Sequence, residues 1–268
     1  MHLVGQKRLT EAFSGDDAVR FFCQKKPHCN SWLAVIPSVA RRTLIPTVEF
    51  RCLLRWTLGI PLISGDQGPV ACPKCTSQMG PSGHHLVCCH LNHISRRHHA
   101  VVEALADVTR RAGFPCRKEQ GAPDGTRPGN LFIPRLDVHG PGAVDVTVRD
   151  PLAPSHPVSQ SAVQGWHLAQ EQDKIRKYGQ MCNRLGWRLV PFVVDVWGGL
   201  GEDASALVGT LLKALLGQKE GWQSREVEAT VWQQLGFAAM REVGKQLVWS
   251  VHTAAEPVYA PMTHQPYF

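Results

Sequence analysis

The sequence contains no run of about 18 apolar residues, which is the length a helix needs to cross a membrane. Its first residues, MHLVGQKRLTEAF, lack the apolar stretch of a secretion signal. The chain also has no internal repeat and no low-complexity tract, features that would indicate a solenoid or a disordered polymer. These absences argue against a membrane partner, and we expect a soluble, intracellular protein.

The charge and the cysteine content indicate the class of partner and the redox compartment of the protein. The 268 residues are 43% hydrophobic, which is enough for a core in one large domain or two small ones. Lys and Arg outnumber Asp and Glu by 29 to 22, so the formal charge is +7 and a polyanionic partner is favoured. Cys occurs 9 times, an odd number, and several of these residues stand at metal-ligand spacing instead of being spread like a disulfide framework. A reducing compartment fits this pattern best.

Helical periodicity dominates residues 1–68, which we interpret as a helical N-terminal region. Its clearest helix is TVEFRCLLRWTLG, where Thr47 can cap the first turn and Gly59 ends the last. The apolar stripe of this helix is expected to consist of Phe50, Leu53, Leu54, Thr57 and Leu58.

The second half of the chain alternates helices and strands. A helix from Ser95 to Gly113 is followed by the short strands CRKEQ, NLFIP and AVDVTV, the last two joined by the hairpin segment RLDVHGPG. A helix from about 161 to 185, the strand WRLVPFVVDV and the helix EDASALVGTLLKALLG come next. The order α-β-β-β-α-β-α over residues 95–218 predicts an α/β (α+β) fold with a mixed sheet flanked by helices. A C-terminal helix in residues 219–250 and a frayed tail over residues 251–268 follow.

A dense group of cysteines and histidines lies in residues 69–94. Cys72 and Cys75 have the C-x2-C spacing with which a tight turn presents two thiolates to one ion, and His85 with Cys89 can supply the remaining pair. We predict a structural zinc knuckle, because four protein ligands leave no coordination position for a reactive water. The alternative is a set of free buried thiols. Two neighbours compete for the ligand roles by spacing alone: His84 and Cys88.

An acid in a valine-rich strand is the second unusual feature. In GAVDVTVRDP the side chain of Asp145 alternates away from the valines and shares its strand face with Ala143 and Thr147. The later helix AQEQDKIRKYGQ presents an acid, a lysine and a tyrosine on one face, with a second lysine beside them: Glu171, Lys174, Tyr178 and Lys177.

This combination suggests phosphodiester chemistry. A divalent metal held by carboxylates polarises a phosphate and lowers the pKa of an attacking water, while an ammonium group orients that water or offsets developing negative charge. The alternative is a surface Glu-Lys pair together with an aspartate at the end of a strand.

Several motifs occur together between SWLAVIPS and VDVWGG: EFRCLLRWTLGIPL, the Cys-Cys-His-Cys cluster, RHH at residues 97–99, RPGN, VDVTV and EQDKIRKY. With them the chain resembles the C-terminal part of the polyproteins of retrotransposons that lack long terminal repeats, the type with a restriction-like endonuclease behind the reverse transcriptase. The resemblance implies a PD-(D/E)xK nuclease core, a zinc knuckle and nicking of target DNA from which reverse transcription is primed. It also implies that Asp145 binds Mg²⁺ or Mn²⁺. The PD-(D/E)xK core carries a lysine on its third strand, at the position where this chain has Thr147. The resemblance implies that Lys174 or Lys177 on the following helix takes the place of that lysine and that Glu171 assists at the same site.

One position departs from the pattern of that family, because Asn130 in RPGN stands where the family has an aspartate. An amide supplies a neutral oxygen in place of a charged carboxylate, so the affinity for a metal should fall. Asp124 in APDG and Glu119 on the preceding strand are carboxylates that could substitute. DNA contacts are expected from basic residues at a helix start and in a loop: Arg96, Arg97, His98 and Arg127.

The sequence therefore predicts a retroelement-derived DNA endonuclease domain, nuclear or cytoplasmic, with structural Zn²⁺ and catalytic Mg²⁺ or Mn²⁺. Its expected partners are DNA and a separate or lost reverse transcriptase domain with its RNA, since these residues contain no reverse transcriptase core. The alternative is a catalytically inactive, zinc-containing module that binds DNA or another protein.

Overall fold

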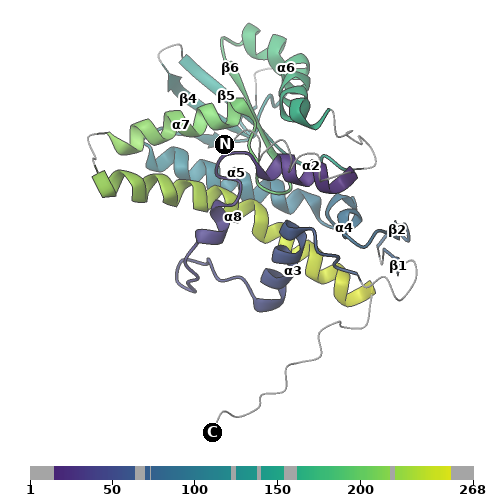
Figure 1. Ribbon diagram of the computed structural model, residues 1–268. Helices are drawn as coiled ribbons and strands as arrows, with labels where there is room; N and C mark the ends of the chain where they lie inside the picture. Colours follow the sequence, from purple (N-terminus) through teal and green to yellow (C-terminus); the bar gives the residue numbers. More distant parts are fainter. Residues whose placement is uncertain are drawn as a thin grey trace, which may run out of the picture.

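The computed structural model describes residues 15–63, 70–72, 74–121, 125–137, 140–153, 162–217 and 221–254, which form a mixed α/β fold (Figure 1). Its helices are α2 (Gly15–Gln24), η1 (Ser31–Ala34), α3 (Thr47–Leu58), α4 (His84–Cys88), α5 (Ile94–Arg111), η3 (Val163–Gly165), α6 (Trp166–Arg184), α7 (Glu202–Leu216) and α8 (Gly221–Ala254). Its strands are β1 (Val70–Ala71), β2 (Gln78–Met79), β3 (Arg117–Lys118), β4 (Leu131–Asp137), β5 (Gly140–Arg149) and β6 (Arg188–Asp195). Within these ranges, no helix combines the length and the apolarity needed to span a bilayer.

A 4-stranded sheet in the order β3-β4-β5-β6 forms the centre of the fold. β4 pairs antiparallel with both β3 and β5, whereas β5 and β6 are parallel and are connected through α6. The expected mixed sheet and the antiparallel pairing of β4 with β5 are confirmed; residues 138 and 139, between these two strands, lie outside the described ranges. The register places Asp145 opposite Pro191 of β6. β6 is an edge strand, where a proline that lacks an N–H is tolerated.

Helices cover both faces of this sheet. Alternation along β5 sends Val144 and Val146 into a core shared with α5, α7 and α8. It sends Asp145 to the other face, toward α6. Figure 1 shows α5, α7 and α8 on one side of the strands and α6 on the other. The candidate acid therefore lies between β5 and α6, away from the main core.

A second core joins segments that are far apart in the sequence. It contains buried side chains of α2, α3 and α4, of the C-terminal half of α8 and of the turn after β6. Trp56 of α3 stacks on Trp197 of that turn, with ring centroids 5.6 Å apart. The N-terminal helices and the Cys/His segment thus pack on α8 and on the end of β6.

Helix α3 differs from its expected form in the face that it buries. It ends at Gly59, which adopts the expected left-handed conformation with φ 70°. Its first residue is Thr47, but Pro46 takes the cap position and no side chain caps the helix. Phe50 and Leu58 are exposed, whereas the buried face consists of Cys52, Leu53, Trp56 and Thr57. The expected stripe was therefore right for Leu53 and Thr57 and wrong for Phe50 and Leu58, and the buried face turns toward Trp56, which stacks on Trp197.

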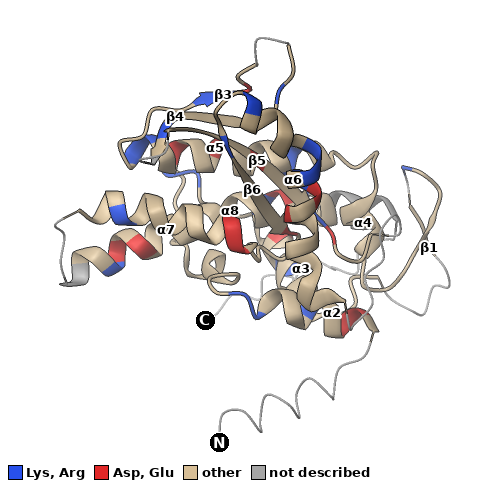
Figure 2. Ribbon diagram, turned by 90° about the horizontal axis from the view of Figure 1, so that it is seen from above, with Lys and Arg blue, Asp and Glu red and all other residues tan. Residues whose placement is uncertain are grey.

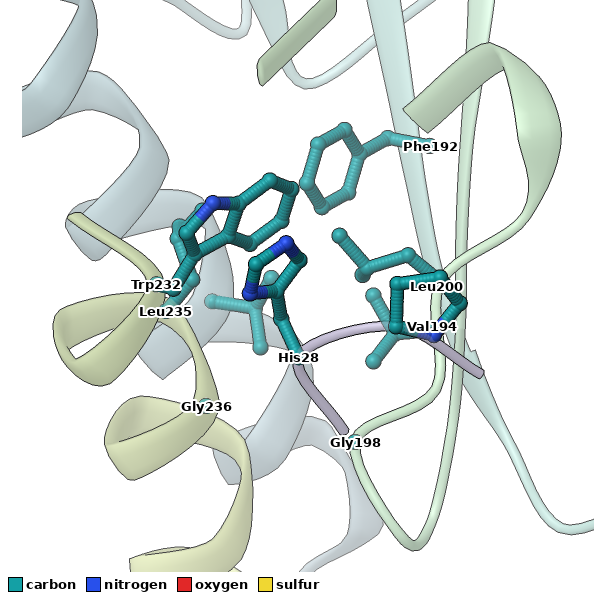
Figure 3. Close-up of a pocket in the computed structure, with 10 residues that line it drawn as sticks. His28, Phe192, Val194, Gly198, Leu200, Trp232, Leu235 and Gly236 are labelled. Carbon is teal, nitrogen blue, oxygen red and sulfur yellow. The ribbon is translucent and has the colours of Figure 1, made fainter. Parts of the chain in front are cut away.

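A crevice where α8 meets β6 is closed by side chains (Figure 3). The ring of His28 stacks on that of Trp232 with centroids 4.1 Å and planes 1° apart. Phe192 and Leu200 line the space beneath, which amounts to about 10 Å³. This is room for about one water molecule, so the crevice belongs to the packed interior and offers no ligand site.

Candidate metal centre and nucleic-acid site

Cys72, Cys75, His85 and Cys89 come together as the sequence predicts. Their ligand atoms all lie within 4.8 Å of one another. Cys75 Sγ is 2.9 Å from His85 Nε2, and Cys72 Sγ is 3.9 Å from Cys89 Sγ. Tetrahedral Zn–S bonds of about 2.3 Å place two sulfurs about 3.8 Å apart. The cluster could therefore hold a metal ion, and its donor set is the one that structural zinc prefers.

Two local structures position these ligands. The segment between β1 and β2 folds back on itself, because Cys72 N–H donates to Ser77 O (2.8 Å) and Thr76 N–H donates to Cys72 O (2.9 Å). Thr76 adopts a left-handed conformation with φ 62°, which makes the reversal tight. Helix α4 then places His85 and Cys89 one turn apart, with Cys89 N–H donating to His85 O (2.8 Å).

The structure separates the ligands from their sequence neighbours. Successive residues of a helix point about 100° apart, so His84 and His85 cannot face the same ion. His84 packs against Trp56, with ring centroids 4.6 Å apart, and its Nδ1 lies 3.7 Å from Asp150 Oδ2. The Cys88 thiol lies 3.6 Å from His85 O as a hydrogen-bond donor. His85 and Cys89 are therefore the ligands that the geometry selects.

The thiols of the cluster differ in their acidity. Hydrogen bonds from the side chain and backbone of Ser77 lower the pKa of Cys75 to about 6. Burial raises the pKa of Cys89 to about 11. A zinc ion requires all of its cysteine ligands as thiolates, so binding of the ion releases protons, chiefly from the more buried thiols.

The structure also brings Asp145 and Lys174 together. Lys174 Nζ lies 2.8 Å from Asp145 Oδ2, and the side chains are 17% and 10% exposed, respectively. Thr147 is buried on the same strand face. The Tyr178 ring centroid is 5.9 Å from the Lys174 ammonium and 4.9 Å from that of Lys177. A hydrogen bond with Tyr178 raises the pKa of the exposed Lys177. This group is a carboxylate paired with a lysine, next to a second lysine.

Asn130 extends the hydrogen bonding between β4 and β5 on either side of Asp145. Its backbone N–H donates to Val144 O (2.8 Å), and its side-chain Oδ1 accepts from Val146 N–H (2.7 Å). Gly129 lets the chain approach β5 closely, because a Cβ there would lie 2.7 Å from Val144 O. The side-chain oxygen expected to stand for a metal-binding carboxylate is thus engaged with the strand.

Glu171 is buried and accepts a hydrogen bond from the first turn of the neighbouring helix α7. Its Oε1 accepts from Asp203 N–H (3.0 Å) in the first turn of α7. Gly201 makes room for this contact, since a Cβ there would lie 2.1 Å from Glu171 Oε1. Burial raises the pKa of Glu171. One carboxylate oxygen of the expected supporting acid therefore caps a helix.

The residues around Asp145 meet only the minimum for a divalent cation. Within the described ranges, the group of three or more His, Cys, Asp or Glu side chains that could share a metal is the Cys/His cluster. Mg²⁺ retains several waters and is commonly bound through one or two carboxylates plus substrate phosphates. Asp145 can supply one carboxylate, so phosphate oxygens would have to complete the coordination.

The basic residues expected to bind DNA come from the start of α5 and from the segment before β4. Arg96 is exposed at the start of α5, and His98 is half-buried. Arg127 is exposed and pairs with Glu119, its guanidinium 3.0 Å from the carboxylate. Asp124, the other carboxylate considered as a substitute, lies outside the described residues. Figure 2 shows further Lys and Arg positions as blue segments on α6 and β3.

Arg97 requires a correction, because it does not lie on the surface. Its side chain is 3% exposed, and its guanidinium donates to Val87 O (2.8 Å). The sequence suggested an exposed helix start rich in Arg and His, but α5 begins between α4 and the end of β5, where this arginine points inward.

Sequence reasoning missed a buried His–Asp pair near the start of α6. His167 Nε2 lies 3.1 Å from Asp195 Oδ2. The other oxygen of Asp195 accepts from the N–H groups of Trp197 (2.8 Å) and Gly199 (3.0 Å). The available signal was VDVWGG, where an acid ends a strand before two glycines and can bind the N–H groups of the turn. This pair fixes the turn that carries Trp197 into the second core.

No family model matches this chain, and no curated protein matches it either. The features of the molecule that bear on function are therefore the Cys/His cluster and the contact between Asp145 and Lys174.

Proposed function

We propose that the chain is a retroelement-type DNA endonuclease domain of the PD-(D/E)xK class that nicks DNA with a divalent metal. The observation that carries the proposal is the 2.8 Å contact between Asp145 of β5 and Lys174 of α6. The element order α5-β3-β4-β5-α6-β6 supports it, because β5 is the third strand of the sheet and the resembled core carries its acid there.

The residues of the chain have separate tasks in this proposal. Asp145 offers the carboxylate for the cation, and Lys174 compensates its charge until DNA arrives. When a phosphate enters, the Lys174 ammonium offsets its negative charge, and the exposed Lys177 attracts the backbone on either side. A bound divalent ion supplies polarisation of the phosphate and a more acidic water. The zinc knuckle stabilises the adjoining lobe.

A second function is favoured by two specific observations. Asn130 Oδ1 is engaged by Val146 N–H, and Glu171 Oε1 is engaged by Asp203 N–H. Both oxygens therefore have roles within the fold, which leaves the carboxylate of Asp145, paired with Lys174, as the group that could hold the cation. The second candidate is thus a zinc-containing domain that binds DNA through the same surface without cutting it.

The test is the nicking of supercoiled plasmid by the full chain in Mg²⁺ or Mn²⁺. Asp145→Asn should abolish nicking, and Asn130→Asp should raise it about tenfold or more, since a second carboxylate strengthens metal binding. An aspartate retains an oxygen that can accept from Val146 N–H, so the substitution preserves this contact. Asp173→Asn, on the exposed side of α6 where Asp173 pairs with Arg176, is the matched control and should leave nicking unchanged.

The two candidate functions give different results in this assay. Absence of nicking by both the natural chain and Asn130→Asp, with duplex binding that weakens steeply as salt rises, would establish the binding function. Absence of duplex binding at low salt would refute both. Nicking that persists in Asp145→Asn would show that the site has been assigned to the wrong residues.

A further inference from the structure

A pocket of about 200 Å³ opens at the C-terminal end of β5, between the start of α5 and the start of α6. The residues that give it chemical character are Arg97, Arg149, Asp150, Trp166 and Gln170. It is distinct from the crevice of Figure 3, which is filled by protein side chains.

The guanidinium of Arg97 is the first unusual group in this pocket. The side chain is 3% exposed, and one of its terminal nitrogens donates to Val87 O (2.8 Å). Its Nε–H is buried and has no hydrogen-bond partner. Burial lowers the pKa of Arg97 to about 10. A buried donor without a partner is costly, so this N–H is available to an acceptor on a ligand.

Asp150 provides the complementary group. Its side chain is 6% exposed, and Oδ1 accepts from Leu152 N–H (2.9 Å). Oδ2 is buried and has no hydrogen-bond partner; His84 Nδ1 lies 3.7 Å from it, and the Arg97 guanidinium is near enough to interact with it electrostatically. The pocket therefore contains a donor and an acceptor that have no hydrogen-bond partner within the described residues. Both belong to charged side chains more than nine-tenths buried.

The remaining lining determines the shape and class of the ligand. Trp166 contributes a buried indole, and Val148 contributes an aliphatic wall. At the rim, Arg149 donates to Gln170 Oε1 (2.9 Å) from an exposed position. An aromatic wall with one donor and one acceptor suits a flat heteroaromatic ring with polar edges, and the cationic rim suits an attached phosphate.

The pocket lies next to the proposed nuclease site along β5 and α6. Asp145 and Arg149 stand on the same face of β5, about 13 Å apart at about 3.3 Å per residue. Gln170 and Lys174 lie one turn apart on α6 and contact Arg149 and Asp145, respectively. A nucleic-acid strand whose phosphate lies at Lys174 would thus carry a neighbouring base to the mouth of the pocket.

We propose that this pocket receives one unstacked base of a single DNA strand whose backbone lies along α6. The inference rests on the proposed function and adds to it a base-binding site a few nucleotides from the phosphate at Lys174. Trp166 stacks on the base, Arg97 donates to a ring acceptor, and Asp150 accepts from a ring or amino N–H.

The experiment measures the binding of short single-stranded oligonucleotides to the full zinc-loaded chain. One position at a time is replaced by an abasic site, and one such replacement should weaken binding about tenfold, as expected for the loss of a stacked base. Asp150→Asn should weaken binding of the intact strand by a similar factor and leave binding of that abasic strand unchanged. An asparagine retains an acceptor for Leu152 N–H, and Asp173→Asn serves as the matched control.

A second measurement, taken together with the plasmid assay, makes the two proposals separable. Free deoxynucleoside monophosphates should change the fluorescence of Trp166 at millimolar concentration, and Trp166→Phe should abolish the change. Oligonucleotide binding with the expected effects of the abasic site and of Asp150→Asn, but without plasmid nicking by the natural chain or by Asn130→Asp, would overturn the proposed endonuclease and support the pocket. Plasmid nicking together with oligonucleotide binding that no abasic position weakens, or that Asp150→Asn weakens equally with and without the base, would overturn the pocket and support the proposed function.

Discussion

Asp145 and Asp150 lie five positions apart and are both buried, but only one of them could be assigned a partner from the sequence. Asp145 interrupts a valine strand, and Lys174 lies at helical spacing from other polar residues on one face of its helix. Strand and helix periodicity together therefore predicted the contact between Asp145 and Lys174. Asp150 follows the strand, and the groups near it come from α4 and α5. Such contacts depend on how the helices pack, which no local pattern encodes. For the same reason the burial of Arg97 could not be predicted.

Glu171 gives a residue-level prediction about pH. Burial raises its pKa in the folded protein above that of the unfolded chain. The folded state therefore holds this proton more tightly, so the contribution to stability is complete below the unfolded pKa of about 4.3 and is lost as pH rises through the folded value. Glu171→Gln removes this titration while retaining an acceptor for Asp203 N–H. The free energy of unfolding of Glu171→Gln, relative to the natural chain, should thus increase from pH 4.5 to 7.5.

Urea unfolding at a series of pH values measures this difference. Glu226→Gln is the control, because Glu226 is an exposed acid of α8 that is not among the groups that shift the pKa of Glu171. The change of relative stability with pH should be larger for Glu171→Gln than for this control. A relative stability of Glu171→Gln that falls as pH rises would contradict the assignment of burial as the dominant effect on this carboxyl group.

At the level of elements, the order of helices and strands was predictable from the sequence. The packing of the N-terminal helices and the Cys/His segment into a second core was not. Period-2 and period-3.6 patterns are local, so α5-β3-β4-β5-α6-β6-α7 appears in the sequence in the observed order. The buried face of α3 includes Trp56, whose partner Trp197 lies 141 positions later, so the sequence pattern predicted Leu53 and Thr57 correctly and missed Trp56. The Cys/His ligand set is an intermediate case. Its spacing was informative, but the choice of His85 over His84 required the direction of each side chain on α4.

Substitution of Gly129 tests how closely the chain before β4 approaches β5, and Gly209 of α7 provides a matched comparison. A Cβ at Gly129 would lie 2.7 Å from Val144 O, and backbone atoms must shift to accept it. Gly129→Ala should therefore lower the free energy of unfolding by about 1–3 kcal/mol. Gly209 lies within α7, where an added Cβ meets nothing within 4 Å. Gly209→Ala should raise stability by about 0.5–1 kcal/mol through its higher helix propensity.

Chemical denaturation of both alanine variants measures the two effects with opposite expected signs. The same substitution at each site makes the pair a matched comparison. Equal stability of Gly129→Ala and the natural chain would mean that the segment before β4 does not approach β5 as closely as described.

At the level of the whole molecule, α8 joins the two cores. Its N-terminal half contributes Val231 and Leu235 to the core beneath the sheet, and its C-terminal half contributes Val243 and Leu247 to the core formed with the N-terminal helices. Buried side chains of the Cys/His segment enter the second core alone. Loss of a metal there should thus act unequally on the two halves of the protein.

Zinc removal tests this division. The segment from Val70 to Asn92 has little secondary structure, so metal binding should supply much of its folding free energy. The natural chain should contain about one zinc per molecule, and a chelator should release it with a marked fall in melting temperature. Hydrogen exchange should then accelerate in α2, α3 and α4 before it accelerates in β4, β5 and β6. Cys75→Ser should reproduce the effect of the chelator without added reagent.

Cys88→Ser is the matched control and should retain both zinc and stability, because that thiol donates to His85 O and a serine hydroxyl can do the same. Equal loss of protection in both cores would mean that the protein unfolds as one unit, and zinc retention in Cys75→Ser would mean that the ion is bound by other residues.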